Sequence, residues 1–149
     1  MTSLHIRDME LSDVDQVYEM GKETPEFTVS DSPGFWGKED LERWVKDKRE
    51  DVLLVAEVED KIVGFVLAKY HKATRLGTIT NIFVKGTHRG RGIGGTLLEK
   101  TKSQLLNKGA TYLYALIKEQ NDPSLGLFRS AGFAEGYDMT WVEYVHNRF

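Results

Sequence analysis

Apolar residues near the start of the chain first alternate with polar ones and then recur at helical spacing. Residues Leu4–Arg7 alternate apolar and polar, which predicts a short strand. Val14 and Val17 lie on one helical stripe, which predicts a helix that begins after Ser12 as N-cap and runs to about Met20. The chain therefore opens with a strand followed by an amphipathic helix.

The next stretch, Thr24–Gly37, has the composition of a loop with unusually many aromatics. It holds all but one of the chain's prolines, together with Phe27, Phe35 and Trp36. These aromatics either cap the core or face a substrate, and the sequence leaves both possibilities open. A second helix is predicted over Lys38–Lys48, where the buried stripe is Leu41, Trp44 and Val45.

Three strands in succession follow the second helix. Val52–Val58 and Ile62–Tyr70 are joined by a tight connection, so they predict a β-hairpin. A second turn leads to Gly77–Val84, which is rich in Thr, Ile, Phe and Val. The three strands are expected to pair antiparallel.

The pattern then changes to strand, glycine-rich loop, helix and strand. The helix ends at Asn107 and the next strand is predicted over Thr111–Ile117, which makes one right-handed βαβ crossover. A short helix, Pro123–Ser130, and one or two closing strands within Phe133–Tyr144 complete the chain. The prediction is an α/β (α+β) fold in one domain, residues 1–149, with a mixed, mostly antiparallel sheet of six to seven strands and about four helices.

Composition restricts the classes of protein and of partner. The chain is 40% hydrophobic and 29% charged, which is typical of a globular protein, and its net charge of −3 argues against a nucleic-acid partner. It has no cysteine, so disulfides, thiolate metal sites and cysteine nucleophiles are excluded. The first thirteen residues mix charged and apolar positions, so we expect neither a signal peptide nor a membrane span, and a cytoplasmic location.

The segment 85–95 concentrates glycines and cations. It holds five glycines and, in Lys85, Arg89 and Arg91, three cations, and a predicted helix begins within it. Glycines allow close approach to the backbone, and a helix start offers unpaired N–H groups and a positive dipole end. Packing alone would not justify so many glycines, so the segment predicts a phosphate-binding loop.

Two known phosphate motifs compete for this loop. The Gly-Lys-Ser/Thr of a nucleotide triphosphatase is absent. The dinucleotide fingerprint is matched by Gly90–Gly95, with Glu119 beyond the next strand as a possible ribose ligand. However, a dinucleotide fold needs repeated βα units, whereas the strands upstream of this loop are antiparallel hairpins. A dinucleotide site is therefore a minor alternative.

Two ordered motifs resemble the GCN5-related N-acetyltransferases (GNAT family). The family signature Gln/Arg-x-x-Gly-x-Gly/Ala fits Arg89 to Gly94 after the strand that ends at Val84. A second family segment, Asn followed by a short helix and an aromatic-x-x-x-Gly-Phe ending, fits Asn121 through Phe133. The order of predicted strands and helices also matches, so the resemblance extends over nearly the whole chain.

The resemblance implies a site for acetyl-CoA between strands Thr78–Val84 and Thr111–Ile117. No metal is expected, because the carboxylates lack the spacing and the histidine company that a metal site needs. It implies that the pyrophosphate lies on the amides of the loop, and that the pantetheine pairs with the strand edge, the Ile82 amide facing the thioester carbonyl. Such a donor would stabilise the developing oxyanion. The implied cofactor-binding residues are Ile82, Phe83, Val84, Arg89, Gly90, Arg91, Gly92, Ile93, Gly94, Gly95, Thr96, Asn121 and Phe128.

The chain departs from the family at the positions that commonly move protons. The tyrosine used as general acid falls at Phe128, and the strand glutamates used as general base fall at Thr78 and Leu116. Direct attack of an amine on a thioester needs a base for the ammonium and often an acid for the thiolate. The candidates that remain for these roles are Glu119, Tyr114 and Tyr137, with Tyr144 behind them.

The function expected from the resemblance is transfer of an acetyl group from acetyl-CoA to a primary amine, either a small amine or a peptide N-terminus or lysine. The missing acid and base motivate a second hypothesis, a CoA-binding sensor or regulatory module without turnover. Acids around the aromatic loop would suit a cationic acceptor; they include Glu23, Asp31 and Glu39. An exposed final strand with Trp141, Tyr144 and Phe149 is compatible with a homodimer.

Overall fold

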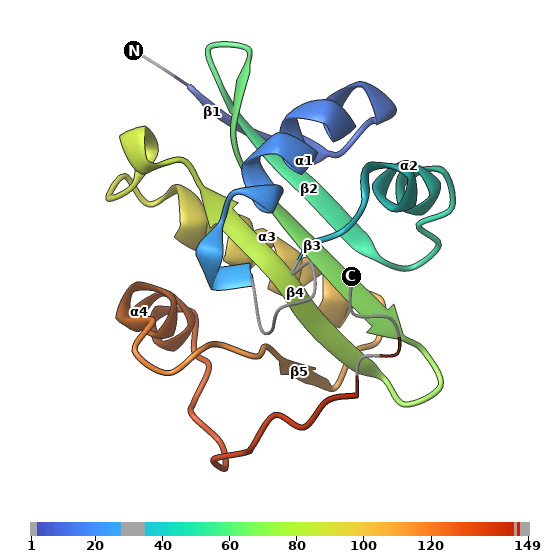
Figure 1. Ribbon diagram of the computed structural model, residues 1–149, viewed down its shortest axis with the longest axis vertical. Helices are drawn as coiled ribbons and strands as arrows, with labels where there is room; N and C mark the ends of the chain where they lie inside the picture. The colour runs from blue at the N-terminus through green and yellow to red at the C-terminus, as the bar shows by residue number, and fades with distance from the viewer. Residues whose placement is uncertain (1–2, 28–34, 145, 147–149) are drawn as a thin grey trace.

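The computed structural model describes residues 3–27, 35–144 and 146, which form one sheet with helices on both of its faces (Figure 1). Within these residues the sheet has five strands, in the order β1-β2-β3-β4-β5. They are β1 (Leu4–Asp8), β2 (Val52–Val58), β3 (Lys61–His71), β4 (Leu76–Val84) and β5 (Tyr112–Tyr114). The first four pair antiparallel and β4 pairs with β5 in parallel, so the predicted mixed, mostly antiparallel sheet is confirmed.

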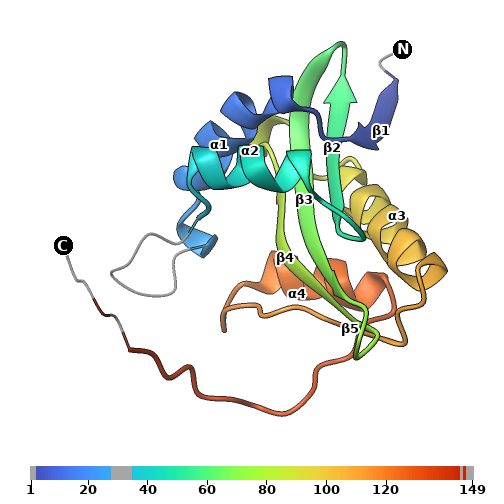
Figure 2. The same cartoon turned by 90° about the vertical axis from the view of Figure 1, so that its right-hand side faces the viewer.

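Helices cover the two faces in pairs (Figure 2). Helices α1 (Val14–Lys22) and α2 (Lys38–Lys46) lie on one face, and α3 (Ile93–Asn107) and α4 (Asp122–Ser130) pack on the other. Short 3₁₀ turns occur at Leu11–Asp13, Pro25–Phe27 and Gly86–His88. The prediction of about four helices is confirmed for the described part of the chain.

The apolar run of β3 is explained by burial on both faces of the sheet. Phe65 and Leu67 point into the core under α1 and α2, whereas Val66 and Ala68 point into the core under α3 and α4. A strand that packs helices on both faces has no solvent-facing side chains, so its sequence reads as continuous and not alternating. The two cores hold β4 in place as well, because β3 is its antiparallel neighbour.

The prediction of six to seven strands is wrong, since the described residues hold five. The strand predicted over Thr111–Ile117 is assigned only at Tyr112–Tyr114, because β4 has no pairing with the chain beyond that point. The closing strands predicted within Phe133–Tyr144 are not formed, and this segment has no ladder partner among the described residues. An alternating apolar pattern is compatible with a strand, but a strand also needs the edge of a neighbouring strand with which to pair.

Candidate active site

Strand β4 has a strand on both sides near its start and on one side only near its end. It pairs with β5 from Leu76 to Thr78, so residues 79–84 have β3 on one side and no strand on the other. At the boundary the register with β3 shifts by one residue, and Thr80 Oγ1 donates to Leu67 O at 2.8 Å. This bulge bends β4 where it separates from β5.

The backbone of the open half of β4 presents unpaired groups to the opening. The Lys85 N–H donates to the Val63 carbonyl of β3 at 2.8 Å. The N–H groups of Lys85 and Phe83 therefore face β3. Because alternate residues of a strand face opposite edges, the N–H groups of Ile82 and Val84 face the open edge. Arg89 Nε donates to Val84 O at 3.0 Å from that side, which agrees with this orientation.

The glycine-rich loop carries the chain from the open strand into α3. Gly90 and Gly92 have φ values of 77° and 80°, a region that favours glycine. Gly92 is the N-cap of α3, and the first helical bond runs from Thr96 N to Gly92 O at 3.0 Å. The N–H groups of residues 92–95 therefore have no acceptor within the helix, and they lie at its positive dipole end.

Open space surrounds these N–H groups. A Cβ at Gly86, Gly90, Gly92 or Gly95 would have no neighbouring atom within 4 Å. Gly94 differs, because its Cβ would lie 3.4 Å from Leu127 of α4. A cavity of about 600 Å³ lies between α3 and α4 and is lined by Gly92, Gly95 and Thr96. The start of α3 thus opens onto a space large enough for an anionic group.

The cations of the loop are available to a ligand. Arg91 is exposed, and none of the salt bridges found among the described residues involves Lys85, Arg89 or Arg91. His88 instead shares a 2.8 Å hydrogen bond with Thr87 Oγ1. The loop therefore joins backbone donors, a helix dipole and, in Arg89 and Arg91, two cations that form no salt bridge among the described residues, which is the chemistry of a phosphate site.

Asn121 and Phe128, the predicted cofactor residues at the start of α4 and within it, make contacts inside the protein. Asn121 Oδ1 accepts a 3.4 Å hydrogen bond from Ser124 N and so caps the start of α4. The Phe128 ring is buried and meets the ring of Phe133 edge to face, with centroids 5.0 Å apart. These contacts show why an apolar ring is stable at position 128, where the resembling family commonly has a tyrosine.

The three predicted proton-transfer residues are not brought together. Tyr114 is half-buried and pairs with Thr78 at the last pair before β4 and β5 separate. Glu119 is exposed between β5 and α4, and Tyr137 is 93% exposed beyond α4. Of the three, Tyr114 is the residue on the sheet at the closed end of the opening.

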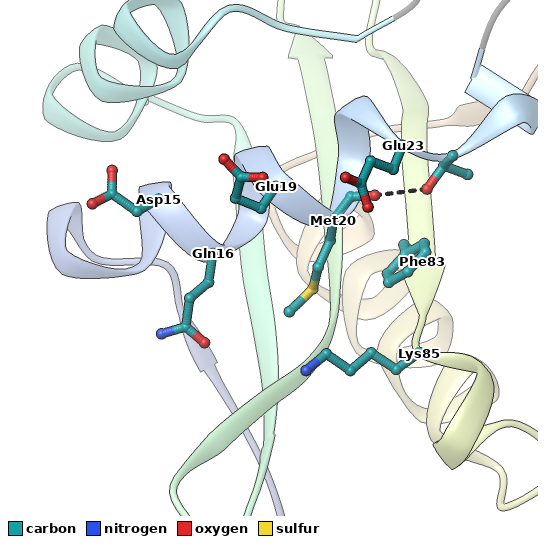
Figure 3. Close-up of a pocket in the computed structure, with 8 residues that line it drawn as sticks. Asp15, Gln16, Glu19, Met20, Glu23, Phe83 and Lys85 are labelled. Carbon is teal, nitrogen blue, oxygen red and sulfur yellow. Dashed lines mark hydrogen bonds between the residues drawn. The ribbon is translucent and has the colours of Figure 1, made fainter.

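A second hollow, of about 580 Å³, lies between α1 and the end of β4 (Figure 3). Its lining includes Asp15, Glu19 and Glu23 from the α1 side and Phe83 and Lys85 from β4 and the residue after it. At the end of α1, beside the hollow, Thr24 Oγ1 donates to Met20 O at 2.8 Å. We call this hollow the α1 groove; its three carboxylates outnumber its one ammonium.

Two of the three acids that line the α1 groove are paired with lysines, and only some of the acids expected from the sequence lie there. Asp15 is paired with Lys38 Nζ at 2.6 Å, and Glu19 with Lys22 Nζ at 3.0 Å. Of the acids expected around the aromatic loop, Glu23 lines the groove, Glu39 of α2 is not among the residues that line it, and Asp31 lies outside the described residues. Asp15 and Glu19 were missed because their spacing on α1 is typical of any solvated helix face.

Two further side chains near the open edge were missed by sequence reasoning. Lys118 Nζ donates to Pro25 O at 3.0 Å and ties the segment after β5 to the end of α1, a contact that no sequence signal announces. Asn81 is buried in β4 and accepts a 3.1 Å hydrogen bond from Trp36 Nε1. Asn81 could have been noticed, because asparagine is uncommon within strands and lies here among Thr, Ile and Phe.

Residues 3–27, 35–144 and 146 hold neither a metal-binding cluster nor a membrane-spanning helix. No three His, Cys, Asp or Glu side chains gather there in a way that could hold a metal ion. No helix in the same residues has the length and apolar character needed to cross a bilayer.

Residues 15–133 match the sequence profile of the acetyltransferase (GNAT) family. An acetyltransferase of Pectobacterium atrosepticum is 32% identical over 81 residues, which cover 52% of this chain and 54% of that protein. A Bacillus subtilis protein provisionally named a ribosomal-protein-alanine N-acetyltransferase is 29% identical over 135 residues, covering 91% and 83% of the two chains. The match thus spans only about half the length of the Pectobacterium relative.

Solved structures show the same fold at low sequence identity. The PaiA N-acetyltransferase of Thermoplasma acidophilum, solved in complex with coenzyme A, has a TM-score of 0.75 and 20% identity. The superposition covers 91% of this chain and 93% of that one. The arrangement of a mostly antiparallel sheet with two pairs of helices is therefore shared with an enzyme that binds CoA.

Proposed function

Because the chain belongs to the acetyltransferase (GNAT) family, we propose that it transfers an acetyl group from acetyl-CoA to a primary amine. One observation carries the proposal: the open half of β4 leads directly into the glycine-rich start of α3. An unpaired strand edge and an anion site in series match a cosubstrate that has amides at one end and phosphates at the other.

The described residues fit CoA at both ends. The N–H groups of residues 92–95, with Arg91 beside them, would hold the pyrophosphate, since the glycines leave the approach open. The outward N–H groups of Ile82 and Val84 would pair with the amides of the pantetheine arm. Arg89 already occupies the Val84 carbonyl, so in this strand we expect Ile82 to supply the unpaired carbonyl.

The proposed reaction is a direct transfer with no covalent enzyme intermediate. The neutral amine nitrogen attacks the thioester carbon, an N–C bond forms, the C–S bond breaks, and the electron pair leaves on the CoA sulfur. The amine loses one proton and the thiolate takes up one. A donor at Ile82 N would stabilise the oxyanion of the tetrahedral intermediate.

Proton transfer is assigned to Tyr114 first, with Glu119 and Tyr137 as the other candidates. Tyr114 is favoured because it sits where β4 and β5 part, so a phenol there borders the opening from the side of β5. Tyr114→Phe removes one hydroxyl and keeps the ring, so kcat should fall roughly 10²-fold or more if it moves a proton. Glu119→Gln and Tyr137→Phe test the other two in the same assay.

The acceptor is proposed to be a cationic amine that enters from the α1 groove. Glu23 supplies negative potential there, whereas Asp15 and Glu19 are each paired with a lysine, and Phe83 supplies an apolar floor. A peptide N-terminus is included in this class, supported by the name of the Bacillus relative, as are small polyamines. We propose a cytoplasmic location, because the reaction needs a supply of acetyl-CoA.

A thiol-release assay with acetyl-CoA tests the activity over a panel of polyamines, lysine peptides and alanine N-terminal peptides. The proposal fails if no member releases thiol above the enzyme-free rate from pH 6 to pH 9, a range set by amine deprotonation. CoA-dependent thermal stabilisation without any turnover would support instead the sensor hypothesis. Stabilisation by NAD(H) and not by CoA would support a dinucleotide site.

Charge reversal in the loop tests the placement of the cosubstrate. Arg91→Glu should remove most of the stabilisation by CoA, which for a ligand at 100 times its Kd amounts to about 2.7 kcal/mol. Lys72→Glu is the matched control, because it makes the same charge change in the exposed turn between β3 and β4, beyond the other end of β4. Equal loss in both variants would mean that CoA responds only to net charge.

A further inference from the structure

A cluster of N–H donors and one cation lies on the face of the sheet that α1 and α2 cover (Figure 2). Its members come from α2, from the residues just before α2, and from the neighbouring strands β3 and β4. They are Trp36, Trp44, Lys69 and Asn81, which we call the tryptophan cluster. None of the four belongs to the residues proposed to bind CoA.

The Asn81 side chain presents an amide nitrogen in a fixed orientation. Asn81 is only 9% exposed, and its Oδ1 accepts the 3.1 Å hydrogen bond from Trp36 Nε1. An indole N–H can only donate, so the amide oxygen faces Trp36 and the amide nitrogen faces away from it. Nδ2 donates to no described residue, but it is not sealed inside the protein, because every buried side-chain N or O atom among the described residues has a partner. Its two N–H groups are therefore available to a ligand.

The Lys69 ammonium is held in place without being neutralised. Its Nζ lies 5.3 Å from the ring centre of Trp36 and 5.1 Å from that of Trp44. Two cation–π contacts restrict this long side chain but leave its charge in place. Among the described residues Lys69 forms no salt bridge. The neighbouring carboxylate, Asp51, has both oxygens occupied at 2.8 Å, by Trp44 Nε1 and by Tyr70 N.

The amide of Asn81 and the ammonium of Lys69 are neighbours on the sheet. Asn81 pairs with Leu67, and Lys69 is the next residue of β3 on the same face. Trp36 joins the two, since its N–H orients the amide and its ring holds the ammonium. The one side-chain oxygen of the tryptophan cluster is already occupied. An oriented N–H donor beside a fixed cation is the combination that binds a carboxylate.

A carboxylate held here would lie beside both the proposed thioester and the α1 groove. Asn81 directly precedes Ile82, whose N–H faces the open edge of β4. Phe83, the next residue of β4 on the same face as Asn81, lines the α1 groove. Consecutive Cα atoms are about 3.8 Å apart, so a ligand that reaches all three positions is small.

We propose that the acceptor is a free amino acid, whose carboxylate is bound by Asn81 Nδ2 and Lys69 Nζ while its amine faces the thioester. The inference rests on the proposed acetyl transfer and names the acceptor within the class of primary amines. Glu23 in the α1 groove attracts the ammonium end, and the donor pair fixes the other end. The amine nitrogen bonds to the acetyl carbon as the C–S bond breaks, the amine loses one proton, the CoA sulfur gains one, and the carboxylate is unchanged. The products are an N-acetyl amino acid and CoA.

Acceptors that differ only in the carboxylate give the first test. L-alanine, L-methionine and L-phenylalanine are each compared with their carboxamides in the thiol-release assay, with rates expressed per unprotonated amine. The amino acid should have a kcat/KM at least about tenfold higher than its amide, mainly through KM, because the amide forms no charge-assisted hydrogen bonds to the site. If the amides are acetylated as well as the amino acids, the acetyl transfer stands and the carboxylate site is overturned.

Two variants assign the preference to the tryptophan cluster. Lys69→Met keeps a side chain that covers the two rings but removes the charge, so the ratio of amino acid to amide should fall about tenfold. Lys61→Met is the control, at an exposed position at the other end of β3, and should keep the wild-type ratio. Asn81→Asp still accepts from Trp36 but replaces the amide donor by an acceptor, and should lower the ratio at least as far as Lys69→Met. A wild-type ratio in Lys69→Met, or in an Asn81→Asp chain that CoA still stabilises, overturns the proposal.

Binding without turnover separates this proposal from the proposed acetyl transfer. The chain has three tryptophans, so NMR shows three indole N–H signals, and that of Trp36 is assigned by its loss in Trp36→Phe. N-acetyl-L-alanine keeps the carboxylate of the product, and N-acetyl-L-alaninamide lacks its charge. The first should shift the Trp36 signal in a saturable way, and the second should shift it much less at equal concentration. Such a difference in a chain that releases no thiol would support the carboxylate site and contradict the acetyl transfer, whereas equal shifts overturn the site.

Discussion

The two halves of the sheet are built from similar strands but are paired to different extents. In the half formed by β1, β2 and β3, every strand is paired along its described length, and β3 is buried on both faces. In the half formed by β4 and β5, pairing stops after three residue pairs, and the nine-residue β4 continues alone on that side. We refer to these as the closed half and the open half.

The difference shows how one sheet supplies both stability and a binding edge. Free strand edges are costly or hazardous when they face solvent, so proteins generally pair or cover them. The closed half pairs its backbone and fills both faces with apolar side chains, whereas the open half keeps backbone donors for a ligand. Variants in the two halves should therefore affect different quantities, stability in the first and ligand binding in the second.

The largest effect is expected from the core of the closed half. Phe65 is fully buried and its ring lies 5.5 Å from that of Phe83 and 5.9 Å from that of Phe35. Phe65→Ala should lower the free energy of unfolding by about 3–5 kcal/mol in urea titrations, because it removes a large apolar contact and leaves a cavity. Leu106→Ala, at a half-exposed site on α3, should cost less than about 1 kcal/mol. Equal losses would mean that burial does not distinguish the two sites.

The closed half is also the part that sequence patterns predict well. The predicted strands Val52–Val58 and Ile62–Tyr70 lie within one residue of β2 and β3 at each end, because burial of alternating or continuous apolar residues leaves a direct pattern. The glycine-rich loop that follows β4 could also be predicted, because the positive φ of Gly92 favours glycine at that position. Pairing between distant segments leaves no such local mark, so the length of β5 and the Lys118 contact could not be predicted.

The second effect concerns the ion network that joins α1 to the closed half. Arg7 of β1 donates to Asp13 at 2.7 Å and 2.9 Å and also to Glu57 of β2. Burial raises the pKa of Asp13, but the hydrogen bonds from Arg7 and from the Glu10 amide outweigh it and hold this pKa below the ordinary 3.8. The carboxylate is therefore stabilised in the folded state.

Because the folded pKa is lowered, the contribution of Asp13 to stability is present above about pH 4 and is lost as pH falls through the folded pKa. Asp13→Asn should cost about 1.5–3 kcal/mol at pH 7, since a charged hydrogen bond is removed. The gap to the wild type should narrow below pH 4 in urea titrations at each pH. Glu50→Gln, the same change from acid to amide at an exposed site, is the control and should cost less than about 0.5 kcal/mol at pH 7. A gap for Asp13→Asn that is constant with pH would contradict the lowered pKa.

A single methyl group at the start of α3, which follows the open half, should change stability and binding in opposite directions. Gly95 is helical and a Cβ there meets no atom within 4 Å, so Gly95→Ala should raise the free energy of unfolding by about 0.5–1 kcal/mol. The methyl group stands where the proposed pyrophosphate would lie, so the Kd for CoA should rise about tenfold, or 1.4 kcal/mol.

Gly126→Ala is the matched control for Gly95→Ala. Gly126 is also helical, in α4, and also has open space at Cβ, so the same gain in stability is expected with no change in the Kd for CoA. Calorimetric titration with CoA and urea unfolding measure the two quantities separately. If Gly95→Ala is stabilised and still binds CoA with wild-type affinity, the phosphate site does not lie at the start of α3.

The smallest change in stability is expected for the lysine that spans the opening. Lys118→Met keeps the side-chain length and removes the donor to Pro25 O, so the free energy of unfolding should change by less than about 0.5 kcal/mol. Lys100→Met is the matched change in the closed half, where Lys100 Nζ lies 3.5 Å from Ile6 O of β1. Hydrogen exchange should respond differently to Lys118→Met and to Lys100→Met.

Exchange in β1 should not accelerate in Lys100→Met, because β1 stays paired with β2. The segments 24–27 and 115–121 should exchange faster in Lys118→Met, because no ladder bond replaces the lost contact between them. If both variants exchange alike, backbone pairing is not what separates the open half from the closed one.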